Sequence, residues 1–278
     1  MAADQAPWAE SGALKMARAG EHIAALEAEI RAFYAREPYV VVAESELDTR
    51  AVVQRARVRE QPPAHLALVA GDAIHNLRST LDLLVHQLIT VNRHIPSKRS
   101  AFPIFETLDD FRTGYKPMVH GMSPLAIEAI RSTAPYRSGN EPLWLLHKLD
   151  ILDKHRLILP ALSSVGTTWV DFGVTFAATI NEMATDLPPE ERAAWIEDAR
   201  KESVLGLNWA EPACPVSDGE QLWRVTFDQI GKIDMNPKFQ FQIVFGLDPA
   251  RGKPVVQTLL ELRSAVESVV DRLLPFLA

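Results

Sequence analysis

The spacing of apolar residues predicts two long N-terminal helices with a β-hairpin between them. From Ser11 to Arg36 the apolar side chains recur at the helical period, at Leu14, Ala17, Ile23, Leu26, Ile30 and Phe33. The valine-rich runs Tyr39–Val42 and Ala51–Val58 flank a polar turn and predict a hairpin at about 39–59. A second long helix is predicted from Pro62 to Pro96, because its opening prolines favour a first helical turn.

The rest of the chain predicts shorter helices, then strands, then one more long helix. Helices are expected at Leu108–Tyr115 and Ser123–Ser132, and from Asn140 to Leu159. Beyond Pro160, β-rich runs cover 167–180, 221–228 and 238–245, with a polar helix over 186–202. Apolar residues recur every three or four positions from Val255 to Leu277, which predicts a C-terminal helix.

These elements together predict an α+β protein. We expect an N-terminal helical bundle with a β-hairpin over residues 1–160, followed by a mainly antiparallel β region and a long C-terminal helix over residues 161–278. The C-terminal helix is expected to return to the first half, so that both parts pack as one unit.

Composition narrows the class of protein. The chain has 278 residues, 47% of them hydrophobic, a net charge of −7 and one cysteine, Cys214. A single cysteine excludes an internal disulfide and a cysteine-rich zinc site, and it favours a reducing cytoplasm. The negative net charge disfavours a general nucleic-acid coating protein, because such binding depends on clustered Lys and Arg. No apolar run approaches the roughly 20 residues that span a bilayer, so no membrane partner is expected.

The most informative pattern is a polar stripe along the second long helix. At about 100° per residue, six polar side chains fall within about a third of the circumference: Asp72, His75, Arg78, Ser79, Asp82 and His86. The apolar residues gather well away from them, at Ala70, Ile74, Leu77, Leu81, Leu84 and Leu88. A solvated face would be rich in Lys and Glu, yet neither occurs between Gln61 and Ser97. The stripe therefore suits a cleft better than bulk water.

Four interpretations of the polar stripe remain open, of which the simplest is a plain solvated face. In a catalytic site, His86 or His75 acts as acid or base near neutral pH, and Arg78 holds an anionic oxygen. In a structural network, Arg78 clamps Asp82 and the histidines satisfy backbone carbonyls. In a metal site, Asp72 with His75 and Asp82 with His86 supply ligands at helical spacing, although Arg78 between them would repel a cation. We expect neither a metal nor another cofactor.

A second charged group lies in the segment His147–Arg156, at the end of a predicted helix. Lys154 and Arg156 would complement the negative C-terminal end of that helix. In the functional alternative they complete an anion pocket beside the polar stripe, which requires the two helices to pack together. The candidate substrate-binding residues are therefore Lys154 and Arg156, and the candidate catalytic residues are His75, Arg78, Asp82 and His86.

Two segments carry a resemblance to known proteins: Gly71–Leu88 (GDAIHNLRSTLDLLVHQL) and Leu143–Leu159 (LWLLHKLDILDKHRLIL). They are similar to an uncharacterised bacterial family that shares both helices and an intervening FPI element. The first 160 residues also distantly resemble HEPN domains, helical bundles that include many metal-independent ribonucleases of defence and toxin systems. The HEPN signature is an Arg followed four to six residues later by a His, whereas seven residues separate Arg78 from His86.

The resemblance implies a HEPN-like protein that cleaves RNA without a metal and takes RNA or another phosphate-bearing ligand as its partner. The first alternative is a non-catalytic binding or assembly module, with the polar stripe as a structural network and the C-terminal helix forming a homodimer. The second alternative is a metal-dependent hydrolase.

Overall fold

The chain folds into two compact units, which the computed structural model describes over residues 6–46, 51–155, 163–167, 188–191, 193, 206–209, 216–226 and 239–277. The helical unit combines residues 1–33, 62–161 and 244–278, and the β unit combines residues 34–61 and 162–243. The sequence predicted a division near residue 160 into two parts, each made of consecutive residues. The units instead place the hairpin with the later strands and the C-terminal helix with the earlier helices.

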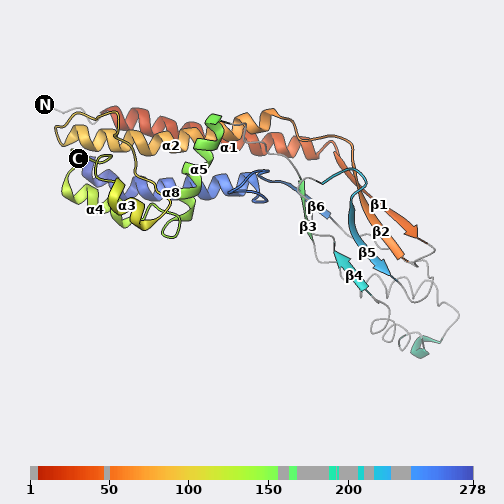
Figure 1. Cartoon of the computed structure of the whole chain (residues 1–278). Helices are drawn as coiled ribbons and strands as arrows, with labels where there is room; N and C mark the ends of the chain where they lie inside the picture. The colour runs from red at the N-terminus through yellow and green to blue at the C-terminus, as the bar shows by residue number, and fades with distance from the viewer. Residues whose placement is uncertain are drawn as a thin grey trace. The chain divides into compact units, whose positions relative to one another are not determined.

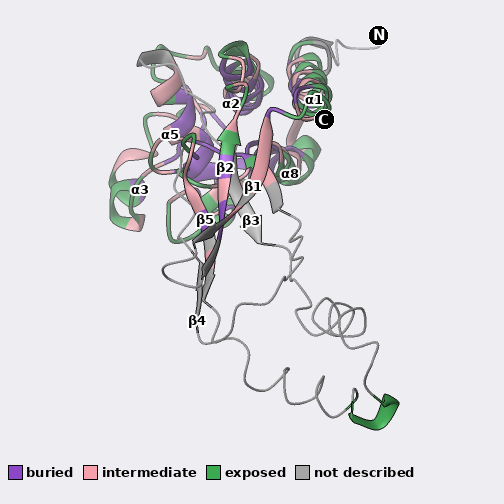
Figure 2. Cartoon of the chain, turned by 90° about the vertical axis from the view of Figure 1, so that its right-hand side faces the viewer, coloured by how far each residue is buried: buried purple, intermediate pink, exposed green. Residues whose placement is uncertain are grey.

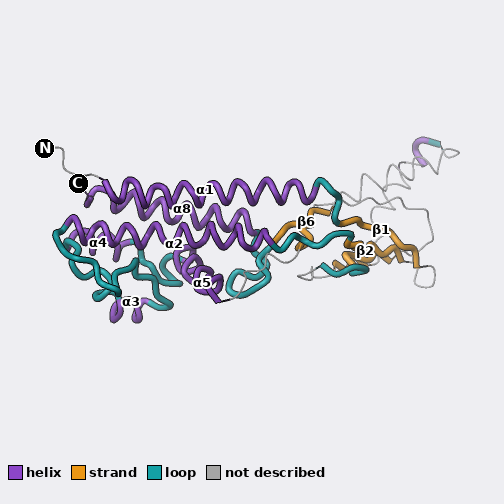
Figure 3. The backbone as a smooth tube through the Cα atoms, turned by 90° about the horizontal axis from the view of Figure 1, so that it is seen from above, coloured by secondary structure: helices purple, strands orange, loops and turns teal. Residues whose placement is uncertain are grey.

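The helical unit is built on four long segments: α1 (Ala6–Tyr34), α2 (His65–Val91), α5 (Glu141–His155) and α8 (Val255–Leu273). Helices α1, α2 and α8 run side by side (Figures 1 and 3). Helix α5 packs against both α2 and α8. A short 3₁₀ turn, Leu274–Leu277, follows α8.

Helix α2 lies at the centre of this unit, and its predicted apolar face is buried. Ala70, Ile74, Leu77, Leu81 and Leu84 are fully buried, and Leu88 is nearly so. Residues on other sides of α2 are buried as well, among them Leu66, Ala73, Val85 and Ile89. Figure 2 shows buried positions concentrated on α2 and α5. Only part of the circumference of α2, including the polar stripe, is therefore left to meet loops or solvent.

The buried face of α1 differs from the prediction in its first half. Leu14 is 67% exposed and Ala17 is exposed, so their assignment to the apolar face is wrong. The inward positions repeat at alternating spacings of three and four, as Gly12, Met16, Ala19, Ile23, Leu26, Ile30 and Phe33. Beside this face, α1 approaches α8 closely at Gly20, where an added Cβ would lie 3.1 Å from Nη1 of Arg263.

Two short helices follow α2, each with a side-chain cap. Helix α3 (Leu108–Gly114) begins after Thr107, and α4 (Pro124–Ser132) begins after Ser123. Each cap hydroxyl accepts a hydrogen bond from a backbone N–H in the first turn, which stabilises the helix start. Before α3, the FPIF segment buries Phe102 and Ile104, which anchors the loop that leads away from α2.

The β unit contains a four-stranded antiparallel sheet in the order β1-β2-β5-β4 and a two-stranded sheet of β3 with β6. The strands are β1 (Tyr39–Glu46), β2 (Ala51–Val58), β3 (Ser163–Thr167), β4 (Gly206–Trp209), β5 (Gln221–Thr226) and β6 (Phe239–Ile243). Tyr39 stacks on Phe241, with ring centroids 4.8 Å apart. Arg55 and Arg57 both pair with Glu44 at 3.0 Å, so the two guanidinium groups share one carboxylate on the hairpin.

The predicted α+β class, with an N-terminal helix and hairpin, an antiparallel sheet and a C-terminal helix, is confirmed. The helix predicted from Asn140 to Leu159 is described as far as His155. Most of the predicted strand over 167–180 and of the predicted helix over 186–202 lies outside the described residues.

Candidate functional site

The polar stripe lies on one unbroken helix, but its side chains serve two different contacts. Helix α2 runs from His65 to Val91 without interruption. Arg78, Asp82 and His86, at successive helical turns, meet the loop that follows α2. His75 instead contacts Asp150 on α5, and Ser79 lies within 3.4 Å of His75, one turn along α2. The Asp72 side chain is exposed to solvent.

Arg78, Asp82 and His86 form a clamp on the backbone of residues 100–102, which we call the loop clamp. Nη2 of Arg78 donates to the carbonyl oxygen of Phe102 at 2.9 Å, and the N–H of Phe102 donates to Oδ1 of Asp82 at 2.8 Å. Nε2 of His86 lies 2.9 Å from the carbonyl oxygen of Ser100, so its proton donates to that oxygen. The loop clamp thus satisfies backbone groups that would otherwise be left unpaired beside the core.

Burial distinguishes the members of the loop clamp from an open anion site. The Arg78 side chain is only 7% exposed, while that of Asp82 is 37% exposed. Nη1 of Arg78 lies 2.8 Å from Oδ1 of Asp82, which pairs the buried charge. A guanidinium held in this way is committed to the protein's own carboxylate and carbonyl. For these three residues the geometry favours the structural network.

His75 has the geometry of an oriented acid or base. Its Nδ1 lies 3.1 Å from Oδ1 of Asp150 on α5, and its Nε2 lies 3.4 Å from Oγ of Ser79, one turn along α2. The His75 side chain is 51% exposed, whereas that of Asp150 is 4% exposed. A proton on Nδ1 donates to the carboxylate and leaves Nε2 as an acceptor. Hydroxyl, imidazole and carboxylate therefore follow one another in the order used by hydrolytic triads.

Asp150 is a site residue that the sequence pattern did not single out. The sequence places it four residues before Lys154, which suggests an exposed ion pair. In the structure Asp150 is buried and faces α2, because it continues the inward row of α5 formed by Leu143 and Leu146. The sequence did contain a signal for this role, because Asp150 lies at helical spacing from two apolar leucines. A carboxylate buried in such a row needs a partner, which points to a polar contact with another element.

The two predicted substrate-binding residues are only partly covered by the structure. Lys154 lies in α5, one helical turn after Asp150, but its side chain lies outside the described residues. Arg156 lies outside the described residues altogether. The two helices do pack together, as the functional alternative requires, because α5 contacts α2. The placement of Lys154 and Arg156 near the stripe stays a prediction.

The ligand sets considered for a metal do not converge in the described part of the chain. No group of three or more His, Cys, Asp or Glu side chains there is arranged to hold a metal ion. Asp82 and His86 are directed to the backbone of residues 100–102, and Asp150 joins His75. His75 and Asp150 are thus better described as a proton-transfer pair than as the start of a ligand set.

Within the described residues, no helix combines the length and the apolar character that crossing a bilayer requires. Comparisons of the chain with protein families, with curated proteins and with solved structures found no match.

Proposed function

We propose that this chain is a HEPN-like, metal-independent ribonuclease in which His75 is the general base. The observation that supports this proposal is the exposed imidazole of His75, oriented through Nδ1 by the buried carboxylate of Asp150. Such an arrangement fixes the tautomer and presents the other ring nitrogen to a ligand. The hydroxyl oxygen of Ser79 lies 3.4 Å from Nε2 of His75, which is the ring nitrogen that can accept a proton.

The surroundings of Ser79 favour a substrate that brings its own nucleophile. Acyl transfer through a serine needs backbone or side-chain donors for the developing oxyanion. Ser79 lies in the middle of α2, where backbone N–H groups are engaged in hydrogen bonds along the helix. RNA supplies a nucleophile in its 2′-hydroxyl and needs only a base to activate it.

The proposed reaction is an internal transesterification. Nε2 of His75 takes the proton of the 2′-hydroxyl, whose oxygen forms a bond to the adjacent phosphorus. The bond from phosphorus to the 5′-oxygen breaks, the leaving oxygen takes a proton from water, and the hydroxide so formed takes the proton from Nε2, which restores the neutral imidazole. The products are a 2′,3′-cyclic phosphate and a 5′-hydroxyl. Lys154 and Arg156 are proposed to hold the phosphate, while Arg78, Asp82 and His86 position α2 through the loop clamp.

The test is cleavage of labelled single-stranded RNA by the purified full chain in EDTA at neutral pH. His75→Ala should lower the rate by about 100-fold or more, and Asp150→Asn by about tenfold or more. His120→Ala, which removes another exposed imidazole of the helical unit, is the matched control and should cleave like wild type. A 2′-deoxy substitution at the cleaved position should abolish the reaction.

Two results would contradict the ribonuclease proposal. One is the absence of RNA cleavage by the wild-type chain in a fully folded preparation. The other is equal cleavage by wild type and His75→Ala, which would identify a contaminating nuclease or a different base. Activity that appears only when divalent cations replace EDTA would favour the metal-dependent alternative instead.

A non-catalytic binding or assembly module is the second candidate, because the loop clamp commits three of the four candidate catalytic residues to backbone groups. A homodimer through α8 would need an apolar face, yet Leu259, Leu262 and Val266 of α8 are already buried. Light scattering of the purified chain tests whether a dimer forms. A cytoplasmic location, favoured by the single cysteine, completes the proposal.

A further inference from the structure

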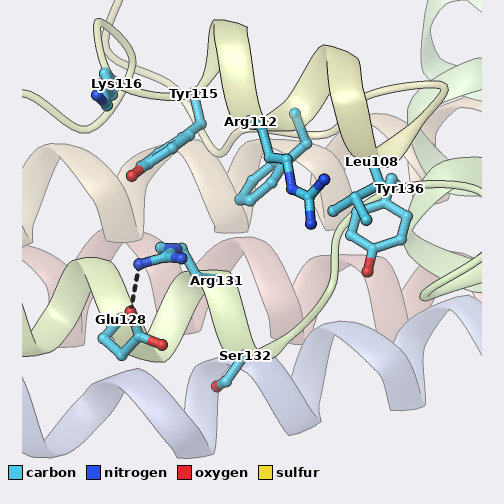
Figure 4. Close-up of a pocket in the computed structure, with 9 residues that line it drawn as sticks. Leu108, Arg112, Tyr115, Lys116, Glu128, Arg131, Ser132 and Tyr136 are labelled. Atoms are coloured by element: carbon cyan, nitrogen blue, oxygen red, sulfur yellow. Dashed lines mark hydrogen bonds and ion pairs between the residues drawn. The ribbon is translucent and has the colours of Figure 1, made fainter.

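A pocket between α3 and α4 gathers cationic and aromatic side chains on the surface of the helical unit. It has a volume of about 310 Å³, and its walls come from α3, the turn at Tyr115 and Lys116 that follows it, α4 and Tyr136. Figure 4 shows Arg112 and Tyr115 reaching from the α3 side, with Arg131 on the α4 side. This volume is at the lower end of the range for small-molecule sites, which starts at about 300 Å³. It therefore suits a ligand with one or two rings.

The charge of this pocket is opposite to the charge of the chain. Arg112, Lys116 and Arg131 contribute three cationic groups, against the single carboxylate of Glu128. The chain as a whole carries a net charge of −7, so the pocket is a local exception. A concentration of one sign of charge in a concave surface attracts ligands of the opposite sign.

The existing ion pairs of these cations are weak enough for a ligand to replace. Nη1 of Arg131 lies 2.8 Å from Glu128, three residues earlier on the same helix, and both side chains are at least half exposed. Nη1 of Arg112 lies 3.3 Å from Asp109, and that pair is more exposed still. Exposed pairs of this kind contribute little to stability, so an anion with several oxygens can compete for the guanidinium groups.

The floor of the pocket is aromatic. Phe111 is buried, and its ring stacks on that of Tyr115 with centroids 4.9 Å apart and planes 16° from parallel. Tyr136 meets Phe111 from another side, with centroids 6.1 Å apart. Tyr115 and Tyr136 are each half-buried, so part of each phenol remains accessible beside the cations. Aromatic faces next to guanidinium groups are suited to a planar ring that carries an anionic group.

We propose that the pocket between α3 and α4 binds a small organic phosphate that carries a planar ring. The phosphate oxygens are held by Arg112, Lys116 and Arg131, and the ring lies against Tyr115 and Tyr136. This site is formed by α3 and α4, whereas the proposed catalytic base lies on α2, so the two proposals stand or fall separately. The shared chemistry fits either an aryl phosphate or a nucleoside monophosphate.

The test is titration calorimetry of the full chain with phenyl phosphate, AMP and inorganic phosphate at low ionic strength. Phenyl phosphate or AMP should bind at least about fivefold more tightly than inorganic phosphate, because the ring adds contacts. Tighter binding of AMP identifies a nucleotide as the source, and tighter binding of phenyl phosphate identifies a monocyclic aryl phosphate. Added salt should weaken binding of either ligand.

Variants locate the binding in this pocket. Arg112→Gln and Lys116→Gln change exposed side chains, so both should fold normally, and each should weaken binding by about five- to tenfold. Arg99→Gln, another exposed arginine of the helical unit, is the matched control and should bind like wild type. Three results would overturn the proposal: no binding of either organic phosphate, equal binding of inorganic phosphate, or unchanged binding in both pocket variants.

Discussion

Replacing Arg78 with Met tests whether the loop clamp stabilises the fold by holding the backbone of residues 100–102 against α2. Met keeps most of the apolar length of the side chain but removes the guanidinium, so packing changes little while the polar contacts disappear. The variant leaves the Phe102 carbonyl without its donor and Asp82 without its ion-pair partner. We therefore expect the free energy of unfolding to fall measurably.

The expected loss follows from the two contacts of Arg78. A hydrogen bond from a charged donor to a buried carbonyl contributes about 1.5–3 kcal/mol. The pair with Asp82 adds roughly 0–1 kcal/mol, because the Asp82 side chain is 37% exposed and keeps water as a partner. We therefore expect Arg78→Met to lower the free energy of unfolding by about 2–4 kcal/mol.

Two measurements report this loss. Urea unfolding followed by circular dichroism at a helix-sensitive wavelength gives the change in the free energy of unfolding. Hydrogen exchange measured on the segment Ser97–Phe105 gives the local effect, because the N–H of Phe102 donates to Asp82. Protection of that amide should fall by about tenfold or more in Arg78→Met.

Arg99→Met is the control for the loop clamp, since Arg99 is exposed and lies in the same loop. It should stay within about 0.5 kcal/mol of wild type. Should Arg78→Met also unfold within that margin and keep the protection of the Phe102 amide, the clamp would have no energetic role. Arg78 would then return as a candidate for binding an anion.

Three further predictions concern the helical unit. Lys148 and Trp144 donate hydrogen bonds to Glu106 and hold the pKa of its carboxyl below the ordinary 4.5. The stability that this carboxylate supplies is present above pH 4.5 and is lost as the pH falls through the lowered pKa of the folded state. Melting curves from pH 3 to 7 should therefore lose this pH-dependent component in Glu106→Gln. Gly139→Ala should cost about 1–3 kcal/mol in urea unfolding, because its Cβ would lie 2.6 Å from the backbone oxygen of Ala134, and a stability equal to wild type would refute the clash. Ser123→Ala removes the N-cap of α4 and should cost about 1 kcal/mol by the same measurement, whereas Ser123→Thr, which keeps an acceptor, should cost less.

Local sequence patterns predicted much of the secondary structure because they act over a few residues. The apolar face of α2 is buried at every position that its period indicated. The helix predicted over Ser123–Ser132 forms as α4, with Ser123 as its cap. The hairpin of β1 and β2 forms where the valine-rich runs predicted it. The helical period, the cap and the strand propensity each depend on residues close together in the chain, so the sequence alone carries this information.

The candidate site could be predicted only as a set of residues on one helix. Helical spacing placed His75, Arg78 and Asp82 on a common stripe, and the structure keeps them there. What each side chain contacts depends on segments far away in the chain: His75 meets Asp150, and Arg78 meets the backbone of Phe102. No local pattern specifies such partners, because they are chosen by how helices and loops pack.

The sequence by itself determined where the helices and hairpin strands lie and which residues of α2 carry polar chemistry. Tertiary structure decided which part of that chemistry is used internally and which faces solvent. Packing buried Arg78 against a loop and left His75 half exposed beside a buried carboxylate. It also turned the inward face of α1 away from Leu14. A helix's period fixes the angle between its side chains, but only its neighbours decide which angle points inward.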